Sequence, residues 1–128
     1  MPQNRDSGAE GNRFGREFGK RVATALGATN ASASSNECDF NGERIVIHCA
    51  RTKTGTVGVT RRMVEKLPAA LGAFEQEDGS FLVYRLPMQS YRSHMKPSRS
   101  LGRSAGNVFV VERKVFEEQG SNVGVFRV

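Results

Sequence analysis

Residues 36–50 read Asn36-Glu37-Cys38-Asp39-Phe40-Asn41-Gly42-Glu43-Arg44-Ile45-Val46-Ile47-His48-Cys49-Ala50. The Asn-Gly pair lies between two runs with strand composition, which is a strong signal for a β-hairpin with a two-residue turn. Side chains of a strand alternate between its two faces. This alternation puts Glu37 and Asp39 on one face of the first strand, and Arg44, Val46 and His48 on one face of the second.

An acid and a histidine on paired strands are components of a metal-dependent hydrolytic site. If Asp39 and His48 point to the same side, the hairpin carries a carboxylate beside an imidazole. Glu17, on a predicted helix, and Glu37 are the candidates for a second carboxylate. Mg²⁺ takes oxygen ligands, often one or two carboxylates with water and substrate phosphate. Asp39 is therefore the predicted metal ligand, and Mg²⁺ is the expected cofactor only if the protein is catalytic.

The flanking sequence predicts an α/β fold, because helical and strand patterns follow one another along the chain. With 128 residues, one domain is expected. We expect a flexible arm over residues 1–12 and a single domain over 13–128, with a central mixed sheet flanked by helices. The predicted elements are helices over 14–26, 60–67 and around 115–116, strands over 71–75, 81–86, 108–111 and 123–128, and a polar irregular segment over 89–106.

This order of elements resembles the PD-(D/E)XK nuclease superfamily of type II restriction endonucleases. The resemblance covers residues 14–86, with Asp39 at the motif's Asp and Val46-Ile47-His48 at its (D/E)-x-K. Two of the three signature positions differ, because Val46 replaces an acid and His48 replaces the lysine. The resemblance implies a restriction-endonuclease-like fold, duplex DNA as the partner, and dimers in enzymes that cut both strands; a homodimer or a place in a larger nucleoprotein complex stays open.

These departures predict impaired catalysis, since valine cannot coordinate a metal ion. Three interpretations follow. The first is a DNA-binding protein without cleavage; the second is a divergent Mg²⁺-dependent endonuclease in which Asp39, with Glu17 or Glu37, holds the metal and His48 positions or deprotonates the water. The third is a non-enzymatic structural or protein-interaction module, in which His48 is an ordinary half-buried strand residue and Asp39 flanks a turn.

The charge balance favours a polyanionic partner. Lys and Arg total 19 against 13 Asp and Glu, a formal charge of +6. Hydroxyl and glycine residues accompany two basic stretches, a composition suited to phosphate contacts, and few aromatic residues are available to stack on single-stranded bases. Duplex DNA is therefore preferred over RNA, although a solvated basic surface is the alternative. The candidate nucleic-acid-binding residues are Arg51, Lys53, Arg61, Arg62, Arg92, Lys96, Arg99 and Arg103.

The cysteines give no disulfide framework and no zinc spacing. Cys38 and Cys49 could form a ligand set with His48 and His94 by count alone, but His48 and Cys49 point to opposite strand faces. No apolar run approaches the roughly 20 residues needed to cross a bilayer. With no leader of signal-peptide form, cytoplasmic residence is expected.

Overall fold

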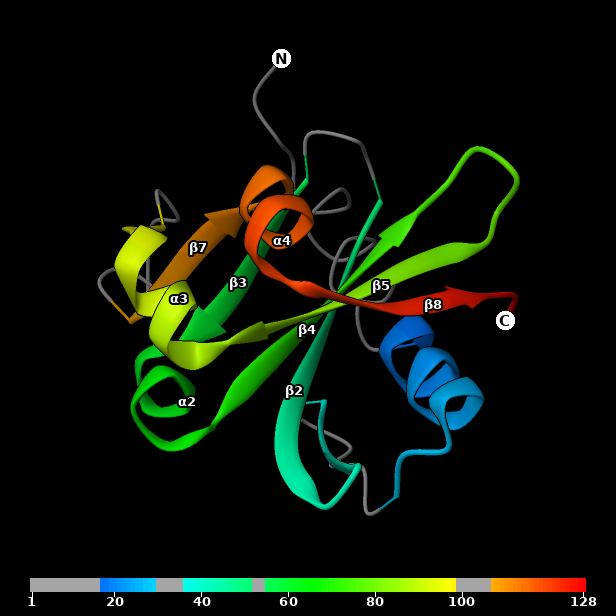
Figure 1. Ribbon diagram of the computed structural model, residues 1–128, viewed down its shortest axis with the longest axis horizontal. Coiled ribbons are helices and arrows are strands. Elements are labelled where there is room, and N and C mark those ends of the chain that lie inside the picture. The colour runs from blue at the N-terminus through cyan, green and yellow to red at the C-terminus, as the bar shows by residue number, and fades with distance from the viewer. Residues whose placement is uncertain (1–16, 30–35, 52–54, 99–106) are drawn as a thin grey trace.

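A mixed five-stranded sheet forms the centre of the protein (Figure 1), in a computed structural model that describes residues 17–29, 36–51, 55–98 and 107–128. The strand order is β1-β2-β4-β5-β8, and only β2 and β4 run parallel. A smaller antiparallel sheet has the order β3-β7-β6. The expected α/β fold with a mixed sheet flanked by helices is confirmed, while the second sheet was not predicted.

A helix over residues 17–26 precedes all the strands of the described chain. The strands are β1 (Glu37–Phe40), β2 (Glu43–Ala50), β3 (Thr56–Thr60), β4 (Ala69–Glu75), β5 (Phe81–Pro87), β6 (Lys96–Pro97), β7 (Val108–Glu112) and β8 (Ser121–Phe126). The labelled helices are α2 (Arg61–Lys66), α3 (Met88–His94) and α4 (Arg113–Gln119).

The predicted hairpin is confirmed, with Asn41 at φ 52° and Gly42 at φ 82° in its turn. Positive φ at both central residues is the geometry that Asn-Gly adopts most readily. The second predicted hairpin is confirmed as β4 and β5. Thr60 caps α2 as predicted, because its hydroxyl accepts a hydrogen bond from the Met63 amide at 3.3 Å.

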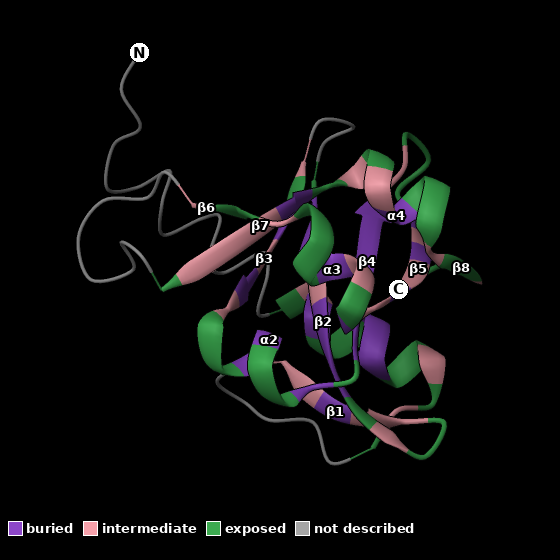
Figure 2. Ribbon diagram, turned by 60° about the vertical axis from the view of Figure 1, so that its left-hand side comes forward, coloured by how far each residue is buried: buried purple, intermediate pink, exposed green. Residues whose placement is uncertain are grey.

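Both faces of the large sheet are buried, which explains the nearly continuous apolar sequence of its central strands. Ile45 and Ile47 of β2 pack on one face beneath the N-terminal helix of residues 17–26. Val46 and Ala50, on the other face, join a core with residues of β3, the three labelled helices and β7. Figure 2 shows this buried interior along β2 and β4. Gly72 permits close packing of α4, since a Cβ there would lie 3.0 Å from the Phe116 ring.

The prediction of an irregular segment over 89–106 is wrong for its first part, where α3 forms. Met88 and Tyr91 are fully or almost fully buried, and both belong to the core. Two apolar anchors therefore hold a helix whose other residues are polar. Residues 99–106 and the arm over 1–12 lie outside the described residues. None of the described helices has the length and apolar character needed to cross a membrane.

Candidate nucleic-acid interface and acidic hairpin

The register of the first hairpin separates Asp39 from His48. Asp39 pairs with Arg44, whereas His48 lies four residues further along β2, beside Gly72 of β4. At the rise of a strand this offset is about 13 Å. The predicted cleft of carboxylate and imidazole therefore does not form between these two side chains.

Asp39 is engaged by a cation, because its Oδ1 lies 3.1 Å from Nε of Arg44. Both side chains are at least one-third exposed, so this ion pair is a weak one. His48 is partly exposed, and burial lowers its pKa below the ordinary value of 6.5. A neutral imidazole in this position is compatible with an ordinary strand residue as well as with a base.

The two other predicted acids are also bound to arginines. Oε2 of Glu37 lies 2.8 Å from Nη2 of Arg62, and the Glu37 side chain is only 14% exposed. Oε1 of Glu17 lies 2.6 Å from Nη2 of Arg21 on its own helix. That helix packs on the Ile45 face of the sheet, whereas the register puts Glu37 opposite Val46, on the other face. The four predicted catalytic residues are therefore not gathered into one site.

The donor set does not fit a magnesium ion. No group of three or more His, Cys, Asp or Glu residues able to hold a metal exists within the part of the chain that the structure describes. Val46, opposite Glu37, supplies no oxygen. Cys38 and Cys49 are buried free thiols, and burial, with a smaller contribution from nearby Glu75, raises the pKa of Cys49 to about 12. Such a thiol is neither a reactive nucleophile nor a ready metal ligand at neutral pH.

Three of the predicted DNA-binding residues, Arg61, Arg62 and Arg92, gather on or against α2. The Arg92 guanidinium, from α3, donates to the Val64 carbonyl of α2 at 2.8 Å. The Arg61 guanidinium stacks over the Phe109 ring with 5.0 Å to the centroid. Lys96 of β6 pairs with Val110, the neighbour of Phe109 in β7, so strand alternation puts its side chain on the other face of the small sheet from Phe109. We call the exposed basic side chains on and beside this helix the α2 face: Arg61, Arg62, Lys66 and Arg92.

Most of the α2 face has a structural contact besides its charge. Arg62 neutralises Glu37, Arg92 satisfies a carbonyl, and Arg61 covers an aromatic ring. Glu65 is the exposed acid on α2 itself. These contacts hold the guanidinium groups of three exposed arginines in place, which reduces the entropy cost when they bind phosphate.

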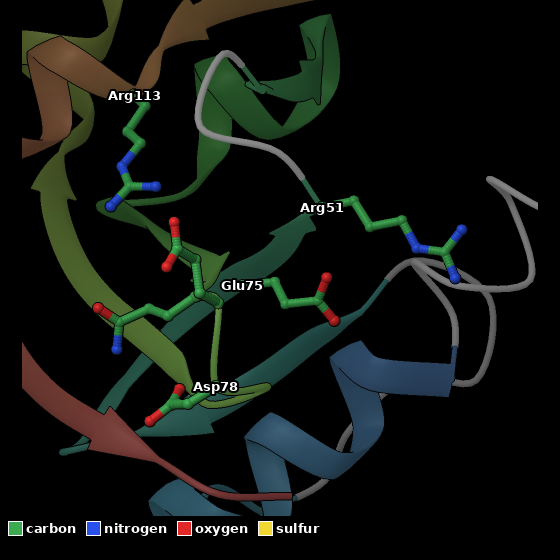
Figure 3. Close-up of a pocket in the computed structure, with 6 residues that line it drawn as sticks. Arg51, Glu75, Asp78 and Arg113 are labelled. Atoms are coloured by element: carbon green, nitrogen blue, oxygen red, sulfur yellow. The ribbon is translucent and has the colours of Figure 1, made fainter.

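Arg51 lies elsewhere, at the carboxyl ends of the parallel strands β2 and β4. It lines an open pocket of about 640 Å³ together with Glu75, Gln76, Glu77, Asp78 and Arg113. Figure 3 shows Arg113 and Arg51 on opposite sides of this pocket, with Glu75 and Asp78 between them and below. Lys53, Arg99 and Arg103 lie outside the described residues, so their positions stay predictions.

The pocket combines both charge signs, and several of its groups have partners. Arg113 stacks over Phe74 at 5.0 Å and pairs with Glu117 at 3.1 Å. Asp78 accepts hydrogen bonds from Ser80 and pairs with Arg127, contacts that lower the pKa of its carboxyl. Sequence reasoning missed this pocket, because the parallel pairing of β2 with β4, which brings Arg51 and Glu75 to the same end of the sheet, has no local signal in the sequence. The only sequence feature that pointed to this pocket was the position of Glu75 at the end of a buried apolar run.

No protein-family model and no curated protein matches the sequence. Among solved structures, the chain is similar to Hjc, a Holliday junction resolvase from the archaeal hyperthermophile Archaeoglobus fulgidus. The identity is 15%, the TM-score is 0.44, and the match covers 89% of this chain and 92% of that chain. At these values the likeness assigns neither a ligand nor an activity.

Proposed function

We propose that this chain is a nucleic-acid-binding protein with a restriction-endonuclease-like fold, which binds duplex DNA through the α2 face and is impaired in DNA cleavage. The observation that carries the proposal is the gathering of Arg61 and Arg62 of α2 with Arg92 of α3 around one short helix. A formal charge of +6 adds a general attraction for polyanions.

Phosphate contact is the chemistry that this surface offers. Arginine and lysine replace the counterions of a nucleic-acid backbone, and the release of those ions drives binding. Arg62 and Arg92 are exposed residues, and one terminal nitrogen of each guanidinium is held by a protein oxygen. This arrangement suits recognition of the backbone and does not by itself read a base sequence.

The small number of exposed aromatic side chains favours duplex DNA over single-stranded nucleic acid as the ligand. The exposed large hydrophobic residues among the described ones are Val125 and Val128, neither of which can stack on a base. Proteins that bind single strands usually provide aromatic platforms. The Phe109 ring, beside the α2 face, is covered by the Arg61 guanidinium.

Impaired catalysis is supported by the separation of the acids. Each of Asp39, Glu37 and Glu17 is paired with an arginine, and Glu17 lies on the opposite side of the sheet from Glu37. A metal-dependent nuclease needs oxygen ligands that converge on one ion. A homodimer or a larger nucleoprotein complex is compatible with this function.

The test is the binding of a mixed-sequence DNA duplex at several salt concentrations, measured by fluorescence anisotropy. The double variant Arg61→Gln, Lys66→Gln is expected to weaken binding and to lower the slope of log affinity against log salt by about 1 for each phosphate that is no longer neutralised. Both substitutions keep Arg62, whose replacement would break its ion pair with the part-buried Glu37 carboxylate.

Lys114→Gln is the matched control, because Lys114 is a 75% exposed lysine on α4 whose ion pair with Glu118, at 3.9 Å, is weak. It removes one charge without touching the α2 face. An equal decrease in affinity per charge in control and test variants would mean that only net charge matters. Absence of salt-dependent binding by the wild type would refute the proposal altogether.

A further inference from the structure

The open pocket at the carboxyl ends of β2 and β4 is a second place where charged side chains gather, apart from the α2 face. Its volume of about 640 Å³ lies within the range of sites for small molecules. In open α/β sheets, the space beyond the carboxyl ends of the strands is the usual place for a ligand. Three acids and two arginines are among the described residues that line it, so a ligand there meets both charge signs.

Arg113, the first residue of α4, is held in place on one side of this pocket. Its side chain is only 15% exposed, and its guanidinium stacks over the Phe74 ring. The ion pair with Glu117 uses Nε, so the two Nη nitrogens remain for another acceptor. Because no buried side-chain nitrogen of the described residues lacks a partner, these Nη atoms are accessible, and Figure 3 shows the guanidinium directed into the pocket. A fixed arginine with unused donors is well suited to bind a carboxylate or a phosphate.

Glu75 offers the opposite charge from the other face of the sheet. It follows Phe74 in β4, so strand alternation points these two side chains to opposite faces. Glu75 is partly buried near the Cys49 thiol, and its carboxylate forms no ion pair with the residues that the structure describes. Because β4 ends here, Glu75 and Arg113 reach the same pocket around the end of the strand. They do not pair with each other, so the two charges are separated across the pocket.

We propose that this pocket binds a small elongated zwitterion, with an anionic group on Arg113 and an ammonium group on Glu75. A carboxylate or a phosphate can supply the anionic end, so the ligand is an ω-amino acid or an aminoalkyl phosphate. The two ends are separated by a short carbon chain, because the arginine and the acid approach the pocket from opposite faces of the sheet.

The mixture of charges makes the pocket selective. A simple anion gains the arginines but is repelled by the carboxylates of Glu75, Glu77 and Asp78. A simple cation gains these acids but is repelled by Arg51 and Arg113. Repulsive groups of this kind contribute to specificity as much as attractive ones do. The same acids disfavour the phosphates of DNA, so binding of the zwitterion is independent of the α2 face.

Titration of the full chain with small zwitterions, followed by NMR signals of the backbone amides and arginine side chains, tests this site. γ-Aminobutyrate and O-phosphoethanolamine are the carboxylate and phosphate probes, and the one that binds more tightly identifies the preferred anionic group. Binding should shift the Nε–H signal of Arg113 and the amide signal of Glu75. α-Aminobutyrate is the matched control, because it contains the same atoms with its charged groups on adjacent carbons. This isomer, butyrate, inorganic phosphate and butylamine should each bind about tenfold more weakly, since each loses one of the two contacts.

Two variants of the pocket provide the second arm. Glu75→Gln should weaken binding of the tighter zwitterion about tenfold, whereas Glu118→Gln, which removes the same charge from a 59% exposed side chain on α4, should leave binding unchanged. Arg113→Lys should also weaken it, because lysine keeps the charge but not the paired donors. Arg113 packs on Phe74, so urea denaturation checks that this variant is folded, and Glu75→Gln tests the site without that contact. Equal binding of inorganic phosphate or butylamine, no binding of either zwitterion, or full binding by Glu75→Gln would overturn the proposal.

Discussion

At the scale of single residues, ion pairing distinguishes this hairpin from a metal site. Glu37 and Asp39 share a face, as alternation along β1 predicts, but each carboxylate meets an arginine. An arginine that satisfies a carboxylate both neutralises its charge and occupies its oxygen lone pairs. The same residue types that suggest metal binding in the sequence therefore make structural contacts in the fold.

Asp39→Ala should have little effect on binding or on stability. The Asp39–Arg44 pair is exposed, and pairs of this kind contribute about 0–1 kcal/mol. The measurement is DNA affinity and the urea midpoint, compared with the wild type, together with cleavage of a duplex in Mg²⁺ or Mn²⁺. Metal-dependent cutting by the wild type that disappears in the variant would establish the divergent nuclease instead.

His48 should make the protein less stable in mild acid. Burial lowers its pKa in the folded state, so below its ordinary value of 6.5 the unfolded chain takes up the proton more readily. Stability from the neutral ring is present above that value and falls as pH decreases, by at most about 1.4 kcal/mol per pH unit. Urea unfolding at pH 7.5 and 5.5 measures the free energy of unfolding at each pH. This free energy should decrease less in His48→Gln than in the wild type when the pH is lowered. An equal decrease in the free energy of unfolding in both proteins would contradict the assignment of the pH dependence to His48.

At the scale of elements, short helices depend on tertiary contacts. α2, α3 and α4 have six or seven residues, too few for a stable isolated helix. Tyr91 of α3 compensates with a buried contact to the small sheet. Its hydroxyl lies 2.7 Å from the Val57 carbonyl and 2.6 Å from that of Phe109, which joins α3 to β3 and β7.

Tyr91→Phe should lower the free energy of unfolding by about 1–3 kcal/mol, because it removes the donor shared by two carbonyls in a buried site. Tyr84→Phe is the matched control, since Tyr84 is partly exposed and no hydrogen bond of its hydroxyl occurs within the described residues. Chemical denaturation measures both variants. A similar decrease in the free energy of unfolding in the control would show that the hydrogen bonds of the Tyr91 hydroxyl do not contribute specifically to stability.

At the scale of the whole molecule, the distribution of charge should set the preference among nucleic acids. The α2 face offers cations without an exposed aromatic platform among the described residues. We therefore expect tighter binding of a duplex than of a single strand with the same mixed sequence, because the duplex has the higher charge density. Competition between the two in one anisotropy assay measures the ratio. A preference for the single strand would contradict the proposed mode of binding.

The features that could be predicted from the sequence are those with local causes. Asn41 and Gly42 adopt positive φ readily, which predicts the turn of the first hairpin. The hydroxyl of Thr60 predicts the start of α2, because it can cap the helix. Strand alternation placed Glu37 and Asp39 on one face. The side chains of β2 are buried alternately in the two cores, because β2 is a central strand of the sheet. The apolar run in its sequence indicated this central position.

The long-range arrangement, in contrast, arises from tertiary contacts alone. Parallel pairing of β2 with β4 creates the pocket of Arg51 and Glu75, and the Glu37–Arg62 pair joins residues 25 apart in sequence. Neither follows from a local pattern, because a contact between distant segments depends on how the entire core closes. The same reason explains α3, whose polar sequence suggested an irregular segment, although Tyr91 and Met88 occupy places in the core.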